Sequence, residues 1–385
     1  MPALDRSVAL LRDYIAIPSV NPMERADLPA SITGERRYAE HVAAQLQRLG
    51  LDAAVIGRGA RASVVAEARP PGDRRAPLLV ASHLDTVPVD GMEIEPFDPR
   101  LDGTRLYGRG ACDTKGGMAA LVAALEIVLP RGTLRRPVVV VGEADEEFGS
   151  SGIADVLAHL GARQPDWVLA TEPTGLRVVT HHKGIAEARL VARGIAGHSS
   201  NPAAGRNAIY AIARAALGLE ALAGRLGARR DPELGPATLS VGLVGGGHGF
   251  NVVPDHAWLV TDRRLLPGED ETTVRRELDA ALADAGVAEF VHVDHVAARK
   301  PALATAATSA AVRDCRAVLA TMDRDAPPTS VAFATDAGLF ARRGVPAVVM
   351  GPGSIEQAHT AREFVEIGEV EAMAEFFVRL LETPG

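Results

Sequence analysis

The sequence predicts an α/β protein, in which a domain with a mainly parallel sheet carries a smaller inserted α+β domain. Three observations lead to this prediction. Short apolar runs alternate with helical stretches through the first half of the chain, whereas strands with one polar face begin near Gly184. Helix and strand patterns return from Ser309 onward. The length of 385 residues is that of two domains of ordinary size.

The first half of the chain begins with two predicted helices. Apolar residues recur at helical spacing in Asp5–Ala16 and in Glu35–Leu49, and Gly50 supplies a stop for the second helix. Continuous apolar runs of four or five residues follow, and such runs are typical of strands buried on both faces of a parallel sheet. The runs are Ala62–Ala66, Leu78–Ala81, Val138–Val141, Trp167–Ala170 and Ala347–Met350. Helical stretches between them, Gly116–Leu129 and Ile153–Leu160, predict helices on both faces of the sheet.

A different order of elements begins at Gly184. The expected elements are a strand at Ile185–Arg193, a helix at Asn207–Leu222, strands at Ala237–Leu243 and Ala257–Arg263, a helix at Thr272–Ala285 and a strand at Phe290–Val296. The order β-α-β-β-α-β is that of a ferredoxin-like domain. We therefore expect residues 184–298 to form the inserted domain, and residues 1–183 together with 299–385 to form the main domain.

Composition and charge disfavour several classes of function. The net charge of −8 and the aromatic content of 4% disfavour a nucleic-acid partner. Charged residues interrupt the N-terminal segment and the apolar stretch near Met118, so no signal peptide, membrane span or membrane partner is expected. Two cysteines, Cys112 and Cys315, provide no disulfide framework and are typical of a reducing compartment. These observations predict a cytoplasmic protein.

Potential metal ligands follow the ends of the predicted parallel strands, and one more begins a helix. In chain order these polar side chains are His83, Asp85, Asp113, Glu146, Glu147, Glu172 and His359. In an open α/β sheet ligands bind outside the carboxyl ends of the strands, so we expect these side chains to meet there. The candidate ligands within the set are His83, Asp113, Glu147, Glu172 and His359. Two imidazoles and three carboxylates suit Zn²⁺, Co²⁺ or Mn²⁺, and they are enough for two ions that share one carboxylate.

The neighbouring carboxylates have other expected roles. Because Glu146 and Glu147 are adjacent, they point in different directions, so that one can bind metal while the other takes a proton from a water molecule. Asp85 lies two residues after His83 and on a strand would point the same way, so it can accept the other imidazole N–H. Each residue also has an ordinary interpretation, such as a solvated turn for the glutamates or a helix cap for Asp113. Their combination at strand ends, rather than any single residue, favours a metal site.

Several motifs together resemble one known family. In chain order they are SHLDTVP, LYGRGACDTKGGMAA, EADEEFGSSG, ATEPTG, GHSSNPAAGRNAI, NVVPD with TDRRLLPG, and GPGSIEQAHTAREFV, and an IPSVNP motif precedes them. The chain resembles the two-zinc amidohydrolases and metallopeptidases that include acetylornithine deacetylase, succinyl-diaminopimelate desuccinylase, aminoacylase and glutamate carboxypeptidase. The motifs run from His83 to Val365 and so cover nearly the whole chain.

This resemblance implies a zinc-exopeptidase-like catalytic domain with an inserted lid, through which two copies pair as a homodimer. It also implies two Zn²⁺ ions, or Co²⁺ or Mn²⁺ in their place, that are bridged by Asp113. The other implied ligands are His83 and Glu172 for one ion, and Glu147 and His359 for the other. Glu146 would be the general base, and Asp85 would be the carboxylate that orients an imidazole ligand.

The resemblance implies substrate contacts as well. In the lid, His198 resembles the histidine that stabilises the oxyanion, in some members from the partner copy of a dimer. Asn251 and Arg264 resemble lid residues that hold the substrate carboxylate, and arginine can do so through two parallel hydrogen bonds. Gly351 and Gly353 would form a backbone wall beside the substrate.

The implied activity is metal-dependent hydrolysis of the amide bond of a small N-acyl amino acid. The loop GPGSIEQAH followed by Glu363 most resembles the acetylornithine deacetylases, which makes N-acetyl-L-ornithine the first expected substrate. A desuccinylase and a dipeptidase or carboxypeptidase of the same family are alternatives. A non-catalytic amino-acid or metal-binding protein is the alternative from another class. One departure from the family pattern is Thr114, which stands where a methionine usually follows the bridging aspartate.

Overall fold

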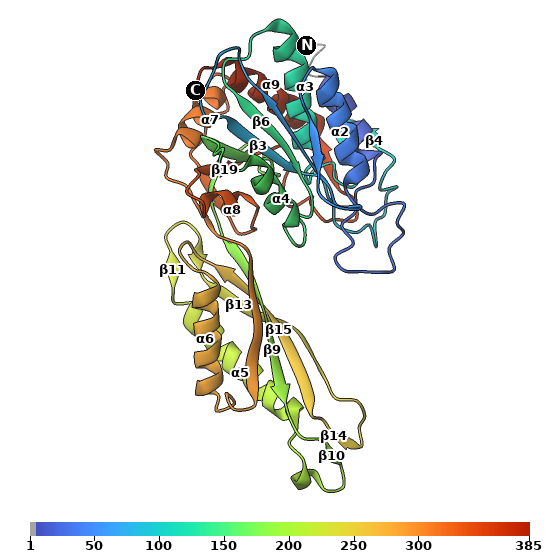
Figure 1. Ribbon diagram of the computed structural model, residues 1–385, viewed down its shortest axis with the longest axis vertical. Coiled ribbons are helices and arrows are strands. Elements are labelled where there is room, and N and C mark those ends of the chain that lie inside the picture. The colour runs from blue at the N-terminus through green and yellow to red at the C-terminus, as the bar shows by residue number, and fades with distance from the viewer. Residues whose placement is uncertain (1–4) are drawn as a thin grey trace. The chain divides into compact units, whose positions relative to one another are not determined.

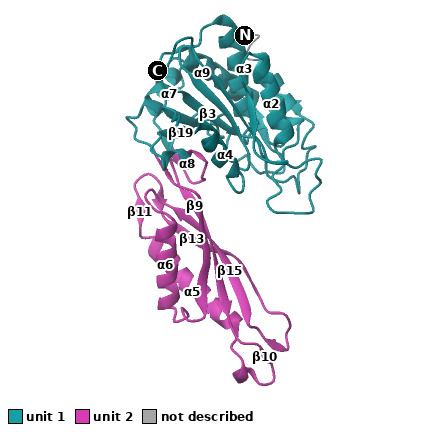
Figure 2. Cartoon of the chain, viewed as in Figure 1, with its two compact units in different colours: residues 1–180, 305–329, 339–385 teal, residues 181–304, 330–338 magenta. Residues whose placement is uncertain are grey.

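The computed structural model describes residues 5–385, which form two compact units (Figure 2). Of the described residues, unit 1 contains 5–180, 305–329 and 339–385, and unit 2 contains 181–304 and 330–338. The division after residue 180 differs by a few residues from the expected boundary at 183, and unit 1 resumes at residue 305 instead of the expected 299. The short segment 330–338 lies in unit 2, although we expected it in the main domain. Contacts distant in sequence explain this, because Ser330 Oγ donates to the carbonyl of Glu233 and Thr335 contacts His182.

Among residues 5–385, the largest sheet has nine strands, and its centre is parallel (Figure 1). The order is β1 (Ala54–Ile56), β2 (Ser63–Ala68), β6 (Val138–Glu143), β3 (Leu78–His83), β7 (Trp167–Ala170), β19 (Ala347–Val349), β8 (Val179–His182) and β17 (Leu303–Ala304), with β18 (Thr329–Val331) paired to β8. Strands β6, β3, β7 and β19 run parallel, which confirms the predicted mainly parallel core.

One strand of that sheet runs in the opposite direction from the one we expected. Strand β2 pairs with β6 in antiparallel register, from Val64 opposite Gly142 to Ala68 opposite Val138. The prediction that the apolar run Ala62–Ala66 belongs to the parallel part is therefore wrong. A continuous apolar run indicates burial on both faces, but it carries no information about strand direction.

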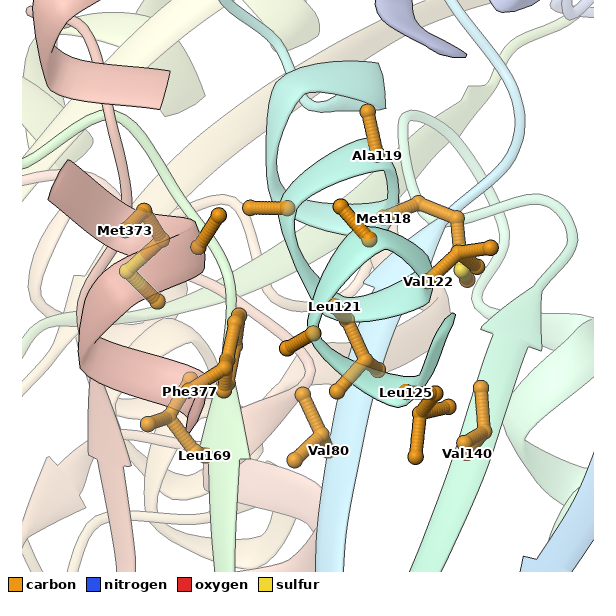
Figure 3. Close-up of a cluster of buried hydrophobic side chains, with 14 of the residues drawn as sticks. Val80, Met118, Ala119, Leu121, Val122, Leu125, Val140, Leu169, Met373 and Phe377 are labelled. Atoms are coloured by element: carbon orange, nitrogen blue, oxygen red, sulfur yellow. The ribbon is translucent and has the colours of Figure 1, made fainter. Parts of the chain in front are cut away.

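The helices of unit 1 are distributed over its sheet. They are α1 (Asp5–Ile15), α2 (Arg36–Arg48), α3 (Lys115–Arg131), α4 (Ser151–Leu160), α7 (Ala310–Ala320) and α9 (Ile367–Glu382), and the short α8 (Ala337–Ala341) begins in unit 2. Helix α3 is buried on every side from Lys115 to Leu125, because it packs against α1, α9 and β3. In Figure 3, Leu121 and Leu125 of α3 lie over Val80 and Val140 of the sheet, with Phe377 of α9 beside them. This core holds the start of α3 rigidly beside the strand ends.

Unit 2 has the ferredoxin-like order that the sequence predicts. Its elements are β9 (Gly184–Arg193), α5 (Ala208–Leu226), β13 (Thr238–Gly246), β15 (His256–Leu265), α6 (Glu271–Asp284) and β16 (Val291–Lys300). The sheet order is β13-β15-β9-β16, and all pairs are antiparallel. Burial alternates strictly along β15, as expected for a strand with one face toward the helices.

Small elements complete the two units. Unit 1 has a three-stranded sheet of β4 (Arg100–Asp102), β5 (Arg105–Tyr107) and β20 (Phe364–Glu366). Unit 2 has two short pairs, β10 (Gly197–His198) with β14 (Val252–Val253) and β11 (Arg230–Asp231) with β12 (Gly235–Pro236), and a 3₁₀ turn at Pro202–Ala204. No helix in the described part of the chain combines the length and the apolar character that crossing a bilayer requires.

Candidate metal centre

The carboxyl ends of the parallel strands bring the predicted metal ligands of unit 1 together. His83 is the last residue of β3, and Glu172 follows β7 by two residues. Glu146 and Glu147 follow β6, and His359 lies in the loop after β19. These strands run parallel, so their ends share one edge of the sheet, where Asp113 also lies just before α3.

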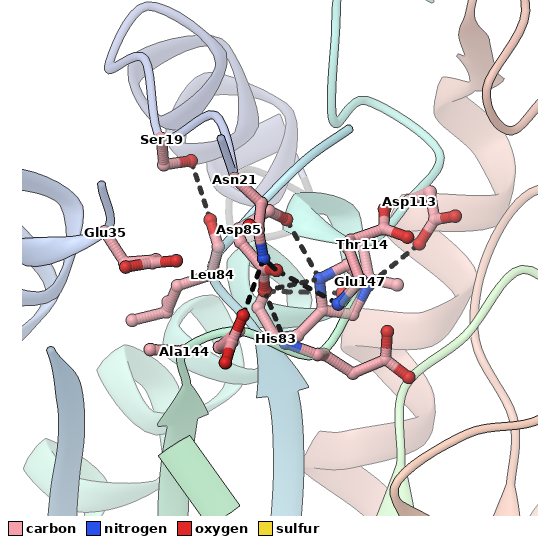
Figure 4. A network of polar contacts seen from close by, with 12 residues as sticks. Ser19, Asn21, Glu35, His83, Leu84, Asp85, Asp113, Thr114, Ala144 and Glu147 are labelled. Carbon is pink, nitrogen blue, oxygen red and sulfur yellow. Dashed lines mark hydrogen bonds and ion pairs between the residues drawn. The ribbon is translucent and has the colours of Figure 1, made fainter. Parts of the chain in front are cut away.

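Asp113 contacts both imidazoles of this cluster, and its contact with His83 is drawn in Figure 4. Its Oδ1 is 2.9 Å from Nε2 of His83, and its Oδ2 is 3.3 Å from Nε2 of His359. An oxygen of Glu172 lies 4.0 Å from the same His83 nitrogen, and an oxygen of Glu147 lies 3.1 Å from the same His359 nitrogen. Each oxygen of Asp113 thus faces one pair of an imidazole and a carboxylate. This is the arrangement that a carboxylate shared by two cations requires.

The donor set fits two divalent ions. The possible ligand atoms of His83, Glu146 and Glu172 lie within 4.8 Å of one another, and so do those of His83, Asp113 and Glu147. Carboxylates are rarely buried in such numbers unless cations or hydrogen bonds compensate their charge. Imidazole nitrogen and carboxylate oxygen are donors that zinc, cobalt and manganese accept. The side chains present are therefore sufficient to hold two such ions with Asp113 between them.

The carboxylates create a strongly negative potential at both imidazoles. Hydrogen bonds with Asp113 and Glu147 raise the pKa of His359 to about 10. Burial opposes the charged form of His83, yet hydrogen bonds with Asp113 and Asp85 and the charge of Glu172 raise its pKa well above the ordinary value. The pKa of Glu147 rises as well, to about 7, because burial and the charge of Asp113 disfavour its ionised form. A potential of this sign attracts cations.

Asp85 organises the loops that carry the other carboxylates. Its Oδ1 accepts a hydrogen bond from the main-chain N–H of Glu146, and its Oδ2 accepts one from that of Glu147, each at 3.0 Å (Figure 4). The expected contact with His83 is only partly as predicted. Nδ1 of His83 lies 2.9 Å from the main-chain carbonyl oxygen of Asp85 and 3.5 Å from its carboxylate. The reason is that β3 ends at His83, so the chain leaves the strand before Asp85.

Behind Asp85 lies a buried polar network that the sequence did not reveal. The Asn21 amide donates to Asp85 Oδ2 at 2.8 Å and to Asp145 Oδ1 at 2.9 Å. Arg61 forms an ion pair with Asp145 at 2.5 Å and donates a hydrogen bond to Glu35 Oε1 at 3.2 Å. Asn21 belongs to the IPSVNP motif, which was the available signal. Arg61 and Glu35 belong to no motif, and their positions follow from the packing of α2 and the loop before β2.

Glu35 provides a prediction about stability and pH. Burial, and after it the charge of Asp85, raises the pKa of Glu35 from 4.5 to about 8. The folded state therefore holds a proton on Glu35 that the unfolded state releases, so this group destabilises the fold progressively as pH rises from 4.5 to 8. Glu35→Gln removes the effect, and its stability relative to the natural protein should rise by up to about 1.4 kcal/mol per pH unit across that window. Urea unfolding of both proteins between pH 5 and 8.5 measures the difference.

A suitable control for this measurement is Glu40→Gln. Glu40 lies on the same helix α2 but is exposed and pairs with Arg36 one turn away. Its pH profile should run parallel to that of the natural protein. Parallel profiles for Glu35→Gln as well would contradict the assignment of a buried, proton-holding carboxyl group.

Three glycines allow the ligand-bearing segments to approach closely. A side chain at Gly117, in the first turn of α3, would clash with Thr171 at the end of β7. A side chain at Gly351 would lie 2.7 Å from the carbonyl oxygen of Glu172, and one at Gly353, whose φ is +90°, would lie 2.6 Å from Cys112 Sγ. The N–H groups of Gly351 and Gly353 bond to Thr174 and Glu369. The structure thus gives both loop glycines a packing role, and a substrate contact by them remains a proposal.

Thr114, the departure from the family pattern, joins the bridging segment to β3. Its hydroxyl lies 3.2 Å from Ser82 Oγ and 3.4 Å from the carbonyl oxygen of His83. Its carbonyl accepts a further bond from Ser82 Oγ at 3.2 Å, and the Asp113–Thr114 peptide bond is cis. The polar side chain of Thr114 therefore forms hydrogen bonds to the strand that ends in a candidate ligand.

The other predicted site residues lie in unit 2. Exposed His198 is on β10, which pairs with β14, and the carbonyl of Asn251 accepts a bond from the N–H of Ser199. Arg264 is partly exposed and pairs with Asp262 at 2.9 Å. Its neighbour Arg263 is buried in ion pairs with α6 and the loop before it, which leaves Arg264 as the accessible arginine of the two.

The chain is similar to known proteins in sequence and in fold. Residues 79–383 match the sequence profile described as peptidase family M20/M25/M40. The acetylornithine deacetylase of Myxococcus xanthus is 35% identical over 312 residues, which cover 78% of each chain. A family M20 metallo-carboxypeptidase of Sulfolobus solfataricus has a similar fold, with a TM-score of 0.77 and 21% identity over 98% of this chain and 99% of that one. A dinuclear metal-binding peptidase of Bacillus subtilis superposes with a TM-score of 0.72 and 16% identity over 99% of this chain and 98% of that one.

Proposed function

The chain belongs to peptidase family M20/M25/M40 and is a metal-dependent hydrolase, and from this premise we propose that it deacylates an N-acyl amino acid. The proposed substrate is N-acetyl-L-ornithine, and the products are ornithine and acetate. The identity of 35% to an acetylornithine deacetylase supports this substrate. The observation that carries the reaction is Asp113, because each of its carboxylate oxygens faces an imidazole and a second carboxylate.

We assign the cations to two positions that share Asp113. His83 and Glu172 complete the first position, and Glu147 and His359 complete the second. Two divalent ions, with zinc as the first choice and cobalt or manganese as alternatives, would polarise the amide carbonyl and lower the pKa of a water molecule. The protein contributes proton transfer, charge stabilisation and substrate orientation.

Glu146 is the proposed general base and acid. It is buried, and its carboxylate lies within 4.8 Å of the ligand atoms of His83 and Glu172. The bond from its main-chain N–H to Asp85 fixes its backbone. In this position Glu146 would take a proton from the attacking water and deliver it to the nitrogen of the leaving amine. The adjacent Glu147 faces His359 instead, so the two glutamates serve different functions.

His198 is the proposed donor to the oxyanion. Its Nδ1 accepts a hydrogen bond from the main-chain N–H of Ser200 at 3.1 Å. With Nδ1 as an acceptor, the neutral imidazole carries its proton on Nε2. An Nε2–H group can donate to the oxygen of the tetrahedral intermediate. Asn251 and Arg264 would hold the carboxylate of the substrate, Arg264 through its guanidinium group.

We further propose that two copies pair through unit 2. Strand β13 is an edge of the four-stranded sheet, and its residues Leu243 and Val244 are 60% and 66% exposed. Tyr210 and Leu217 of the adjoining helix α5 are also exposed. An exposed apolar edge strand is a template for pairing with another chain. A second copy would cover it symmetrically.

His198→Ala is expected to lower kcat by about 10²- to 10³-fold, because one oxyanion donor is lost. If His198 acts on the partner copy, mixing His198→Ala with Glu146→Gln should restore about a quarter of the natural activity, since half of the dimers are mixed and each has one complete site. Light scattering after gel filtration would establish the dimer. A mixture no more active than its components would contradict action across the dimer.

The proposed substrate is tested with an amine-release assay. The panel contains N-acetyl-L-ornithine, other N-acetyl amino acids, N-succinyl-diaminopimelate and several dipeptides, each with a chelator control. We expect chelator-sensitive hydrolysis with the highest kcat/KM for N-acetyl-L-ornithine. A higher kcat/KM for the succinylated substrate or a dipeptide would overturn the substrate and keep the reaction class. No hydrolysis by protein that binds two metal ions would favour a non-catalytic binding protein.

A further inference from the structure

Glu363 is a buried carboxylate with a complete set of hydrogen bonds to the segment that carries Asp113. Its Oε1 accepts from the main-chain N–H groups of Cys112 at 2.9 Å and Asp113 at 3.1 Å. Its Oε2 accepts from the N–H of Gly110 at 3.0 Å and from Arg109 at 2.7 Å. The side chain is fully buried, so no bulk water competes for these contacts. Glu363 thereby holds four donors of one short loop in a single geometry.

The same residue belongs to the segment that carries His359. Only three residues separate His359 from Glu363, whose carbonyl oxygen also accepts from the N–H of Gly108 at 3.1 Å. Strand β20 begins directly after Glu363 and pairs with β5. Two segments about 250 residues apart in sequence are therefore joined at Glu363. One carries the shared aspartate, and the other carries an imidazole that faces it.

The two proposed metal positions differ in how their histidine ligands are supported. His83 ends a fully buried strand, and Glu172 follows another and packs against Gly351. His359 has no such support, because it lies in a loop with a φ of +60° and its side chain is 51% exposed. The position of His359 relative to Asp113 thus depends on what joins their two segments.

We propose that Glu363 is a positioning residue for the second metal position. It fixes the main chain of Asp113 relative to His359, so that both side chains can face the same ion. The inference rests on the proposed two-metal site. It assigns to Glu363 no contact with substrate. Outer residues that orient metal ligands commonly change metal affinity by about 10- to 100-fold when they are replaced. We expect that loss to fall on the second ion.

The test is a titration of metal-depleted Glu363→Gln with Co²⁺, followed by visible absorption and by metal analysis. Glutamine has one acceptor oxygen, and its NH₂ group would face N–H donors in place of the second oxygen. We expect the first Co²⁺ to bind as in the natural protein and the second to bind about 10- to 100-fold more weakly. His359→Ala, which removes a ligand of the second position, provides the reference for this pattern.

Glu366→Gln is the matched control. Glu366 lies three residues further along and bonds to Thr104 and Arg105 instead of the Asp113 segment, so we expect both Co²⁺ steps to stay unchanged. Glu363→Asp keeps the charge but shortens the side chain, and it takes the same test if the glutamine variant does not fold. The proposal is overturned if the folded variant binds both Co²⁺ ions with the affinities of the natural protein. It is also overturned if both binding steps weaken equally and the melting temperature falls. These titrations contain no substrate, so natural protein that binds two Co²⁺ ions but hydrolyses no N-acyl amino acid would contradict the proposed function alone.

Discussion

Replacing Glu146 by glutamine is expected to reduce kcat by about 10²- to 10⁴-fold, the range that a general acid–base group contributes. Glutamine has nearly the same shape but accepts no proton from the attacking water and delivers none to the amine. The main-chain bond from residue 146 to Asp85 does not depend on the side chain, so the loop should remain in place. Metal content should therefore stay at the natural value. Steady-state kinetics together with metal analysis of the same sample measure both quantities.

The adjacent glutamate supplies the comparison for this experiment. Glu147 lies 3.1 Å from His359 in the second proposed metal position. Glu147→Gln should lower the occupancy of that position, and added metal should recover part of its activity. Glu146→Gln should not recover activity at any metal concentration. A near-normal kcat in Glu146→Gln would sink the assignment of the base, while lost metal in that variant would assign Glu146 to the ligands instead.

Asp113→Asn should have the most severe effect on metal binding. The natural side chain presents one oxygen to His83 and the other to His359, at 2.9 and 3.3 Å. Asparagine offers one oxygen and one NH₂ group, so it has no acceptor for one of the two positions. We expect fewer than two bound ions and a fall in kcat/KM of at least about 10³-fold, since several kcal/mol of transition-state stabilisation are lost. Metal analysis after gel filtration and substrate kinetics provide the measurement.

Asp102→Asn is the control for that variant, because Asp102 is an exposed carboxylate on β4 of the same unit. It should retain both metal ions and natural kinetics. Removing metal from the natural protein with a chelator should abolish activity, and Zn²⁺ or Co²⁺ should restore it. Two bound ions and natural kinetics in Asp113→Asn would show that the aspartate is not shared between two cations.

Much of the arrangement around the site follows from patterns that are local in sequence. Apolar runs with a polar residue directly after them predicted β3 and β7, together with His83 and Glu172 at their ends. In the parallel part of the sheet, strand ends share one edge, so side chains from distant positions were expected to meet there. The ferredoxin-like order of unit 2 was likewise readable, because alternating strands and helical periods are short-range signals.

Other features depend on long-range contacts that leave no local pattern. The antiparallel direction of β2 and the membership of residues 330–338 in unit 2 belong to this group. So do the Asn21 amide behind Asp85 and the Glu363 carboxylate beneath the Asp113 loop, which join segments 64 and 250 residues apart. An amide or a carboxylate acquires such a role only when folding places suitable donors and acceptors around it.

The amino-acid sequence was thus sufficient to identify the kinds of donor atoms at the candidate site and the sheet edge that gathers them. The three-dimensional packing was needed to establish that the two oxygens of Asp113 face different imidazoles, and that Asp85 contacts His83 mainly through its backbone. The physical reason is the separation in sequence between the residues that interact. Periodicity and strand ends reflect interactions among neighbours in sequence. The direction in which one carboxylate oxygen points is instead determined by the packing of segments that meet only in the folded chain.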